Sequence, residues 1–309
     1  MTLPPEGGAL PGALPLSPDM VSATATRRRP ARVEIRLLGR EHEVASAVHY
    51  RQTAIGACTV EAAICAGGSA AAGKPNEDAL LVMPPDAPGE PVLLLVADGH
   101  FGADAAELAV AAVGKAWASA SPEVREDSEE ALLRLVRMAQ AAIAEAGTQG
   151  ETTLLLAVVH NGTALRWASV GDSYLYRLPP GRGGRRVNRL DRVWLGSRLI
   201  VPIHQVTRRG RFELAPGTRV LLTTDGVPEA IRNVPTLGAR QIRAALDGGG
   251  DRPLDALVRT ALDCGGEDNI AAVLITVGGE GCAGVSKPPR EARWATVWRA
   301  LRRGQRDGG

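Results

Sequence analysis

Short runs of apolar, often β-branched residues recur along the middle of the chain and are separated by turn residues. Such runs are typical of buried β-strands, and Asn161-Gly162 between two of them is a strong hairpin signal. Because the runs are apolar throughout rather than alternating, we expect most of these strands to be covered on both faces. The predicted strands are 79–83, 92–97, 152–159, 164–170, 174–178, 219–224 and 270–277.

Longer stretches rich in Ala, Leu and Glu predict helices at 103–119, 128–146, 238–246 and 254–262. Asp127 or Ser128 can cap the second of these helices, and the acidic residues that follow suit the first turn of a helix. The helices come in blocks between groups of consecutive strands. This order indicates an α+β fold with antiparallel sheets rather than a doubly wound parallel sheet.

Composition divides the chain of 309 residues into three parts. Residues 1–45 are rich in Pro, Gly, Ala and Arg, which predicts a flexible leader, and residues 279–309 predict a basic tail. Residues 46–278 carry the regular pattern and are expected to form one domain. With 36 Lys+Arg against 34 Asp+Glu and only 3% aromatic residues, the whole chain offers no case for nucleic-acid binding.

The chain shows no pattern of a secreted or membrane-spanning protein. No apolar run approaches the ~18 residues that a membrane-spanning helix needs, and the N-terminus lacks a secretory signal. The four cysteines form no C-x-x-C pair, and a chain of this size does not need disulfides. We therefore expect a cytoplasmic protein.

Acidic residues stand at the mouths of several predicted strands. A single Asp-Gly usually does no more than make its turn. If several such ends converge, however, their like charges crowd together, which costs energy unless a cation offsets it. Carboxylate oxygens without His or Cys favour Mg²⁺ or Mn²⁺, and a pair of such ions is typical of phosphate-ester hydrolysis. The groups are Asn76-Glu77-Asp78, Asp98-Gly99, Asp172, Asp225-Gly226 and Asp268.

Taken in order, these groups and their neighbours resemble the motif series of the metal-dependent type 2C protein serine/threonine phosphatases. The resemblance covers residues 53–277 and implies a four-layer αββα sandwich, in which helix pairs flank two antiparallel β-sheets. Each motif is weak alone, but six in the right order are specific. The matching segments are Asn76-Glu77-Asp78, Ala97-Asp98-Gly99-His100, Gly150-Glu151-Thr152-Thr153, Val170-Gly171-Asp172-Ser173, Thr224-Asp225-Gly226 and Asp268-Asn269.

The resemblance implies two Mg²⁺ or Mn²⁺ ions and a third, more weakly bound one. Asp98 would bridge the two ions, and the carbonyl of Gly99 would bind one of them. Asp225 and Asp268 would complete the coordination of the second ion.

The remaining acidic motifs take supporting roles by the same resemblance. Glu77 would be a direct metal ligand, and Asp78 a ligand or a partner of bound water. Asp172 would help to hold the third ion, and Asn269 would orient the ligands from behind.

Two further residues would act on the substrate. His100 occupies the position that can protonate the leaving Ser or Thr oxygen in eukaryotic relatives, and a histidine suits this role because its ordinary pKa lies near neutrality. Lys74 stands where the family often has an arginine that grips the substrate phosphate, although a lysine lacks the arginine's bidentate fork. The chain also departs from the family at Phe101, Glu151 and Tyr174.

Two hypotheses for the function follow. In the first, the protein is a phosphatase that hydrolyses phosphoserine and phosphothreonine by direct attack of a metal-activated water, so its partners are phosphorylated proteins and the kinase that opposes it. In the second, it is a catalytically weak or inactive module that binds a phosphoprotein or ligand without turning it over. We favour the enzyme because none of the departures removes a metal carboxylate.

Other patterns point elsewhere. The segment from Gly68 to Lys74 fits the start of a phosphate-binding P-loop, but Pro75 stands where that motif requires Ser or Thr. Arginines at 181–186 and 208–211 form basic clusters, each interpreted as a solvated loop or a contact for a phosphoprotein.

The C-terminal tail has helical periodicity. Trp294, Val297, Trp298 and Leu301 fall on one helix face, and from residue 287 onward the tail has seven basic and two acidic residues. Weak docking on an anionic membrane surface or an acidic partner and packing against the protein's own domain are both open interpretations.

Overall fold

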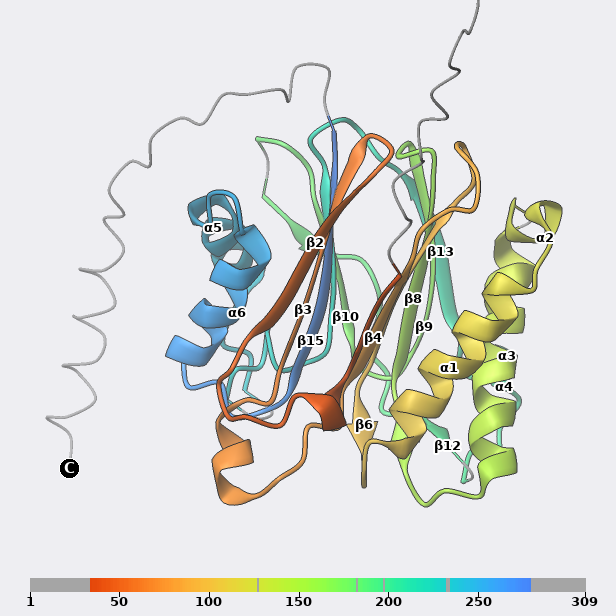
Figure 1. The fold of residues 1–309 in the computed structure, drawn as a ribbon, viewed down its shortest axis with the longest axis horizontal. Helices are drawn as coiled ribbons and strands as arrows, with labels where there is room; N and C mark the ends of the chain where they lie inside the picture. Colours follow the sequence, from red (N-terminus) through yellow and green to blue (C-terminus); the bar gives the residue numbers. More distant parts are fainter. Residues whose placement is uncertain (1–33, 127, 182, 197, 232–233, 279–309) are drawn as a thin grey trace, which may run out of the picture. The chain divides into compact units, whose positions relative to one another are not determined.

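A computed structural model describes residues 34–126, 128–181, 183–196, 198–231 and 234–278 (Figure 1). The apolar face predicted in the tail lies outside these residues, as does most of the predicted leader. The described residues form two large antiparallel β-sheets that lie face to face, with helices on both outer sides. This is the predicted four-layer αββα sandwich.

The first sheet contains six strands that pair antiparallel throughout. In spatial order these strands are β1 (Ile35–Leu38), β4 (Ala79–Met83), β5 (Val92–Ala97), β8 (Leu154–His160), β9 (Ala164–Val170) and β13 (Arg208–Glu213).

The second sheet also has six antiparallel strands. In spatial order these are β11 (Arg185–Arg186), β10 (Tyr174–Leu178), β14 (Arg219–Thr223), β15 (Ile270–Val277), β3 (Cys58–Cys65) and β2 (His49–Ile55).

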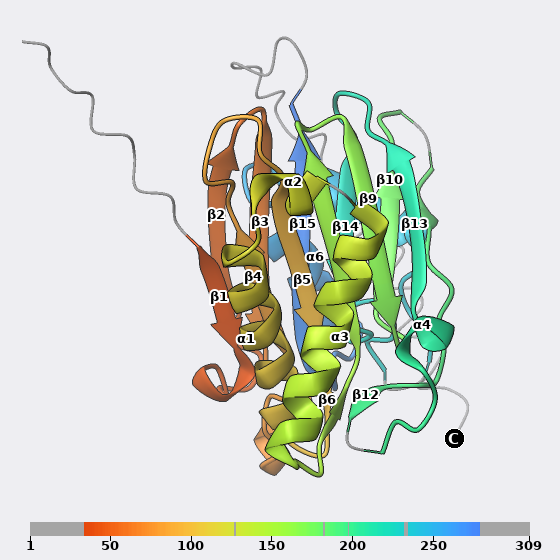
Figure 2. The same cartoon turned by 90° about the vertical axis from the view of Figure 1, so that its right-hand side faces the viewer.

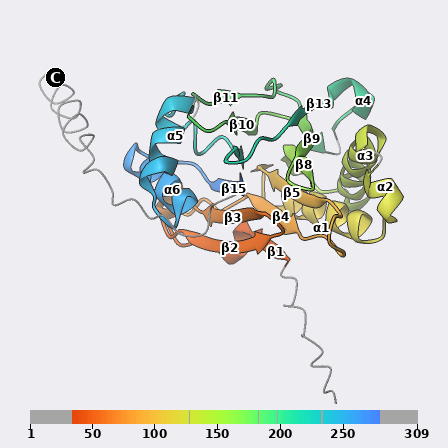
Figure 3. The same cartoon turned by 90° about the horizontal axis from the view of Figure 1, so that it is seen from above.

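The helices cover the outer face of each sheet, as the view from above shows (Figure 3). Helices α1 (Asp104–Ala118), α2 (Pro122–Glu126) and α3 (Ser128–Ala146) lie over the first sheet (Figure 2). Helices α5 (Ala239–Gly248) and α6 (Pro253–Asp263) lie over the second, and the short α4 (Ile203–Val206) packs near α3. None of the helices in the described ranges is long and apolar enough to cross a membrane.

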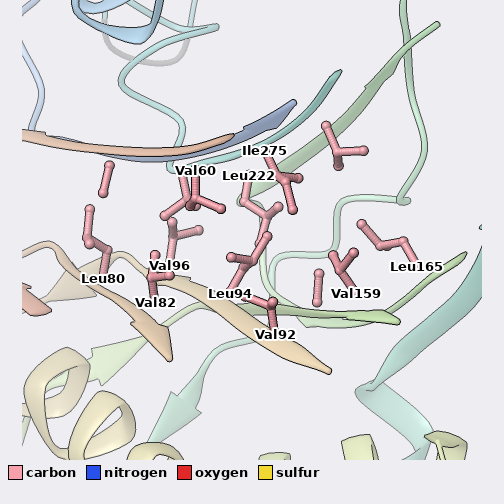
Figure 4. Packing of buried hydrophobic residues seen from close by; sticks show 14 of the residues in the cluster. Val60, Leu80, Val82, Val92, Leu94, Val96, Val159, Leu165, Leu222 and Ile275 are labelled. Atoms are coloured by element: carbon pink, nitrogen blue, oxygen red, sulfur yellow. The ribbon is translucent and has the colours of Figure 1, made fainter. Parts of the chain in front are cut away.

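Strand β5 shows why the apolar runs are continuous. Leu94 and Val96 point into the core between the two sheets (Figure 4), whereas Leu93 and Leu95 point into the core beneath α1 and α3. Both faces of the strand are therefore buried, and all six of its residues are apolar. A strand covered on both sides has no polar face to alternate with.

A third, small sheet crosses one end of the sandwich. It consists of β12 (Leu195–Gly196), β7 (Glu151–Thr152) and β6 (Gly99–His100), and β6 lies at the lower end of the sheets in Figure 1. The strand predicted over 152–159 is therefore two strands. Strand β7 keeps the register of β8 against the preceding β5–β6 segment, and the Thr153 N–H donates to the carbonyl oxygen of Asp98 at 2.9 Å within that ladder. The two strands are separate because the neighbour on their other side changes from β9 to β12.

Several expectations from the sequence need correction. The predicted leader of residues 1–45 contains β1, whose four residues pair with β4 at the edge of the first sheet. The basic cluster at 208–211 is not a loop but part of β13, which pairs with β9. Strand β3 escaped prediction because Glu61 interrupts it, yet Glu61 is buried and accepts hydrogen bonds from the Tyr50 hydroxyl and the Leu254 N–H at the start of α6.

The two Asp-Gly motifs need glycine because backbone passes close by. A Cβ on Gly99 would lie 2.4 Å from the carbonyl oxygen of Glu77, and one on Gly226 would lie 2.0 Å from that of Asn269. Neither glycine has a positive φ angle, so close approach, not the turn itself, excludes a side chain. These contacts bring the segments that carry the other acidic motifs against the strand ends.

We predict that Gly99→Ala and Gly226→Ala each lower the free energy of unfolding by about 2 kcal/mol, because the backbone must move to admit the methyl group. Chemical denaturation measures this change. Gly183→Ala is the control, since nothing lies within 4 Å of its added Cβ. Equal stability of all three variants would contradict the close packing.

Candidate active site

Asp98 is the fixed point of the site. It follows β5 directly and is buried. Its N–H donates to Thr153 Oγ1 at 2.9 Å, and its carbonyl oxygen accepts from Thr152 Oγ1 at 2.9 Å. Thr153 Oγ1 also lies 2.7 Å from Ser173 Oγ. Hydrogen bonds thus join three of the recognised motifs around Asp98.

Asp78 is held from the opposite sheet. Thr224 Oγ1 donates to Asp78 Oδ2 at 2.8 Å and accepts from the N–H of Ala271 at 2.9 Å. Asn269 connects the neighbouring segments, because its Oδ1 accepts from the Glu77 N–H at 3.0 Å and its Nδ2 donates to the carbonyl oxygen of Ala66 at 2.9 Å.

The acidic side chains converge at this end of the sandwich. Burial, followed by the charges of Asp78, Asp225 and Asp268, raises the pKa of Asp98 well above its ordinary value. Burial also raises the pKa of Asp78, with further contributions from Asp225 and Asp268. For Asp225, burial and the charges of Asp268 and Asp172 raise the pKa to about 7, although a hydrogen bond with Asp98 opposes the shift.

The aspartates of the cluster differ in their burial. Asp78 and Asp98 are buried, whereas Asp172, Asp225 and Asp268 are partly exposed. Three of the carboxylates are therefore in contact with solvent, whereas Asp78 and Asp98 lie beneath the surface. Carboxylates in such a position are protonated or balanced by a cation.

The donor chemistry of the cluster fits hydrated Mg²⁺ or Mn²⁺. In the part of the chain that the structure describes, no three His, Cys, Asp or Glu side chains form a group that could hold an ion by themselves. An all-protein cage of the zinc kind is thus not built here. Mg²⁺ usually keeps several waters and takes only one or two carboxylates, and a cluster with partly exposed carboxylates can supply these.

The expected role of Glu77 as a metal ligand stays a prediction, and the structure adds two contacts to it. Its Oε1 accepts from the N–H of Gly102 at 2.5 Å, and its Oε2 lies 4.0 Å from Lys74 Nζ. The carboxylate of Glu77 thus anchors the loop between Asp98 and α1.

His100 lies beside the cluster. Its Nδ1 is 3.8 Å from Asp98 Oδ1, and its buried Nε2 has no hydrogen-bond partner among the described residues. Burial lowers the pKa of His100, while the charges of Asp172 and Glu77 act to raise it. The neighbouring carboxylates thus oppose the effect of burial on the protonated ring.

Lys74 places a positive charge at the rim. Its Nζ donates to Asp268 Oδ1 at 3.1 Å, and its side chain is 31% exposed. The lysine thus faces the carboxylates, at the site where the sequence predicted a contact with the substrate phosphate.

The residues that depart from the type 2C pattern lie in different surroundings. Tyr174 packs in the core beneath α5 and α6, and its hydroxyl donates to Glu229 at 2.5 Å. Glu151 lies across from His100 in the small sheet. Phe101 is 74% exposed and adopts a φ of 64°, a left-handed conformation that is uncommon for a bulky side chain.

Trp194 was missed by sequence analysis. Its Nε1 donates to Asp172 Oδ1 at 3.2 Å, and its ring meets the His100 ring edge to face at 5.0 Å between centroids. Gln140 on α3 stabilises the adjoining β12, since its side-chain amide exchanges two hydrogen bonds with the backbone of Gly196. Neither residue belongs to a motif, so only the three-dimensional structure reveals them.

Comparison with known proteins places this geometry in context. The sequence model of the family described as Stage II sporulation protein E (SpoIIE) matches residues 88–278. No curated protein sequence matches the chain.

Solved structures of serine/threonine phosphatases share the fold. The catalytic domain of the serine/threonine protein phosphatase PstP, in complex with two manganese ions, is 22% identical, with 75% of this chain and 100% of that chain covered at a TM-score of 0.53. The PPM Ser-Thr phosphatase MsPP from Mycobacterium smegmatis is 21% identical, with coverages of 75% and 97% and a TM-score of 0.51. The serine-threonine phosphatase 2C from Toxoplasma gondii is 16% identical, with coverages of 74% and 98% and a TM-score of 0.56.

The raised pKa of Asp225 predicts a falling stability with rising pH in protein stripped of metal. Asp225 binds its proton more tightly when folded, at a pKa of about 7, than when unfolded, at about 4. Stability is therefore lost as pH rises through this window. We expect wild-type protein in EDTA to lose on the order of 2 kcal/mol more than Asp225→Asn between pH 5 and pH 8.

Calorimetric melts at several pH values measure this difference. Asp251→Asn, an exposed position, is the control and should keep the wild-type slope. Asp191, whose pKa is lowered by its hydrogen bond to Arg208, acts in the opposite sense only at lower pH. Because His42 and His100, whose lowered pKa values favour folding as pH rises, are present in both proteins, only the difference between them tests Asp225. Equal pH dependence of wild type and Asp225→Asn would contradict the prediction.

Proposed function

The chain belongs to the SpoIIE family of PPM-type phosphatases, and from this membership we propose that it is a Mg²⁺- or Mn²⁺-dependent protein serine/threonine phosphatase. Its substrates would be phosphoserine and phosphothreonine in proteins, placed there by an opposing kinase. The observation that carries the proposal is the clustering of Asp78, Asp98 and Asp225, whose pKa values are raised by burial and by neighbouring carboxylates that include Asp268.

The proposed roles of these residues differ with their position in the site. Asp98, Asp225 and Asp268 would hold two ions, with the carbonyl of Gly99 as an additional ligand and Asp78 on the buried side. Asp172, fixed by Trp194, would contribute to a third and weaker site. When bound, the ions would supply an activated water and offset the charge of the phosphoryl oxygens.

His100 would serve as the general acid for the leaving oxygen. The motivation is its place beside Asp98, together with a buried Nε2 that has no partner among the described residues. A proton donated from this ring would neutralise the Ser or Thr oxygen as its bond to phosphorus breaks.

We expect hydrolysis of a phosphothreonine peptide in the presence of Mn²⁺. Because Asp98 holds the centre of the cluster, Asp98→Asn should lower kcat/KM by at least about 100-fold, and EDTA should abolish turnover. Release of inorganic phosphate measures the rate, with Asp251→Asn as the matched control. Turnover that survives both EDTA and Asp98→Asn would reject the mechanism.

The role of His100 has its own test. His100→Asn should lower kcat on a phosphothreonine peptide by about 100-fold. On p-nitrophenyl phosphate the loss should be small, because this leaving group departs without protonation. Equal losses on both substrates would remove His100 from the role of general acid.

A second candidate is a phosphatase-like module that binds without turnover. The observation that favours it is the ammonium of Lys74, which pairs with the proposed metal ligand Asp268. Titration calorimetry with Mn²⁺ separates the two candidates. A protein that binds no ion at millimolar Mn²⁺ would be such a module.

A further inference from the structure

Lys74 contacts the carboxylates at which a cation is expected. Its Nζ lies 3.1 Å from Asp268 Oδ1 and 4.0 Å from Glu77 Oε2. Its charge also acts on the buried Asp78, since it lowers the pKa of this carboxyl and so opposes the effect of burial. Lys74 therefore offsets part of the negative charge of the cluster.

The backbone around Lys74 is attached to the loop that carries Asp268. The short helix Gly68–Ala72 (η2, orange at the lower left of Figure 1) precedes it, and the N–H groups of Gly68 and Ser69 donate to the carbonyl oxygens of Gly266 and Glu267 at 2.8 and 3.0 Å. These bonds fix the distance between the two backbones. The ammonium, in contrast, sits on a flexible side chain that is 31% exposed and can move.

Asp268 has little capacity for a second cation at the same oxygen. Its Oδ1 already accepts from Lys74 Nζ and from the Asn269 N–H at 3.0 Å. An ammonium and a divalent ion at one carboxylate oxygen would repel each other strongly at that distance. Binding of an ion through Oδ1 of Asp268 therefore requires the ammonium to move away, and an ion at the other oxygen of this carboxylate would be repelled by it.

We propose that Lys74 is an internal counter-ion that competes with a divalent ion for Asp268 and becomes available to the substrate phosphate only when that ion is bound. The inference rests on the proposed function, because it assumes that the site binds both a divalent ion and a substrate phosphate. Ion binding and phosphate binding are then coupled through one side chain. While it pairs with Asp268, the ammonium is directed to a carboxylate instead of a phosphate.

The competition predicts tighter ion binding when the charge is removed. Titration calorimetry of Mn²⁺ into the metal-stripped full chain compares wild type with Lys74→Met, and we expect about fivefold tighter binding in the variant, the size of a partly exposed ion pair. Lys74→Arg keeps the charge and should bind Mn²⁺ no more tightly than wild type. Lys115→Met, on α1, is the matched control and should bind like wild type.

The free energy by which Lys74 stabilises the carboxylates should also appear in the stability of the metal-free protein. Without Lys74 the carboxylates lose a counter-charge, so Lys74→Met should melt at a lower temperature than wild type in EDTA at pH 8. Saturating Mn²⁺ should close most of this gap. A purely structural role would leave the gap equal with and without the ion.

The outcomes are distinct. This inference alone is overturned if Lys74→Met binds Mn²⁺ as tightly as wild type or more weakly. It is likewise overturned if Mn²⁺ leaves the difference in melting temperature unchanged. If neither wild type nor Lys74→Met binds Mn²⁺, the proposed metal-dependent function fails as well. Binding of Mn²⁺ to the variant but not to wild type supports the competition in its strongest form.

Discussion

Repulsion between buried carboxylates is the constraint on which the rest of the site depends. Asp78 and Asp98 are almost fully enclosed, and the neighbouring aspartates make their ionisation harder still. Isolated buried charges are far too costly for a protein of ordinary stability. The fold tolerates this arrangement because two rigid sheets hold the strand ends in place, while the hydroxyl of Thr224 and the ammonium of Lys74 offset part of the charge.

The close approach of neighbouring strand ends within each sheet depends on residues that have no charge at all. Glycine at positions 99 and 226 lets the carbonyl groups of Glu77 and Asn269 lie where a Cβ would otherwise be. The buried leucines and valines of β5 and its neighbours then pack the two sheets together (Figure 4). The acidic cluster that function requires therefore lowers stability locally. Apolar packing provides the rigidity that holds this electrostatically unfavourable cluster in place.

Much of this arrangement could be predicted from the sequence. Strands that are buried on both faces leave a continuous apolar signal, so 92–97, 164–170, 174–178 and 270–277 were predicted with the bounds that the structure has. The order of the acidic motifs identified the family and the region of the site. The direction of individual side chains could not be predicted, because it depends on contacts between distant segments.

Glu77 and Trp194 illustrate this limit. Nothing local in the sequence shows that Glu77 accepts a hydrogen bond from Gly102, or that Trp194 reaches Asp172. The edge strands were also missed. In β2 and β13 polar residues outnumber apolar ones, since a strand at the edge of a sheet has a partner on one side only.

Strand β13 has a consequence for how the molecule behaves among its neighbours. It ends the first sheet and carries arginines at 208, 209 and 211, while no other strand of the described residues pairs with its outer edge. An open sheet edge invites pairing with another chain, and clustered positive charge repels a second copy of the same edge. The arginines that were first interpreted as a solvated loop or a phosphoprotein contact thus disfavour edge-to-edge pairing of the sandwich.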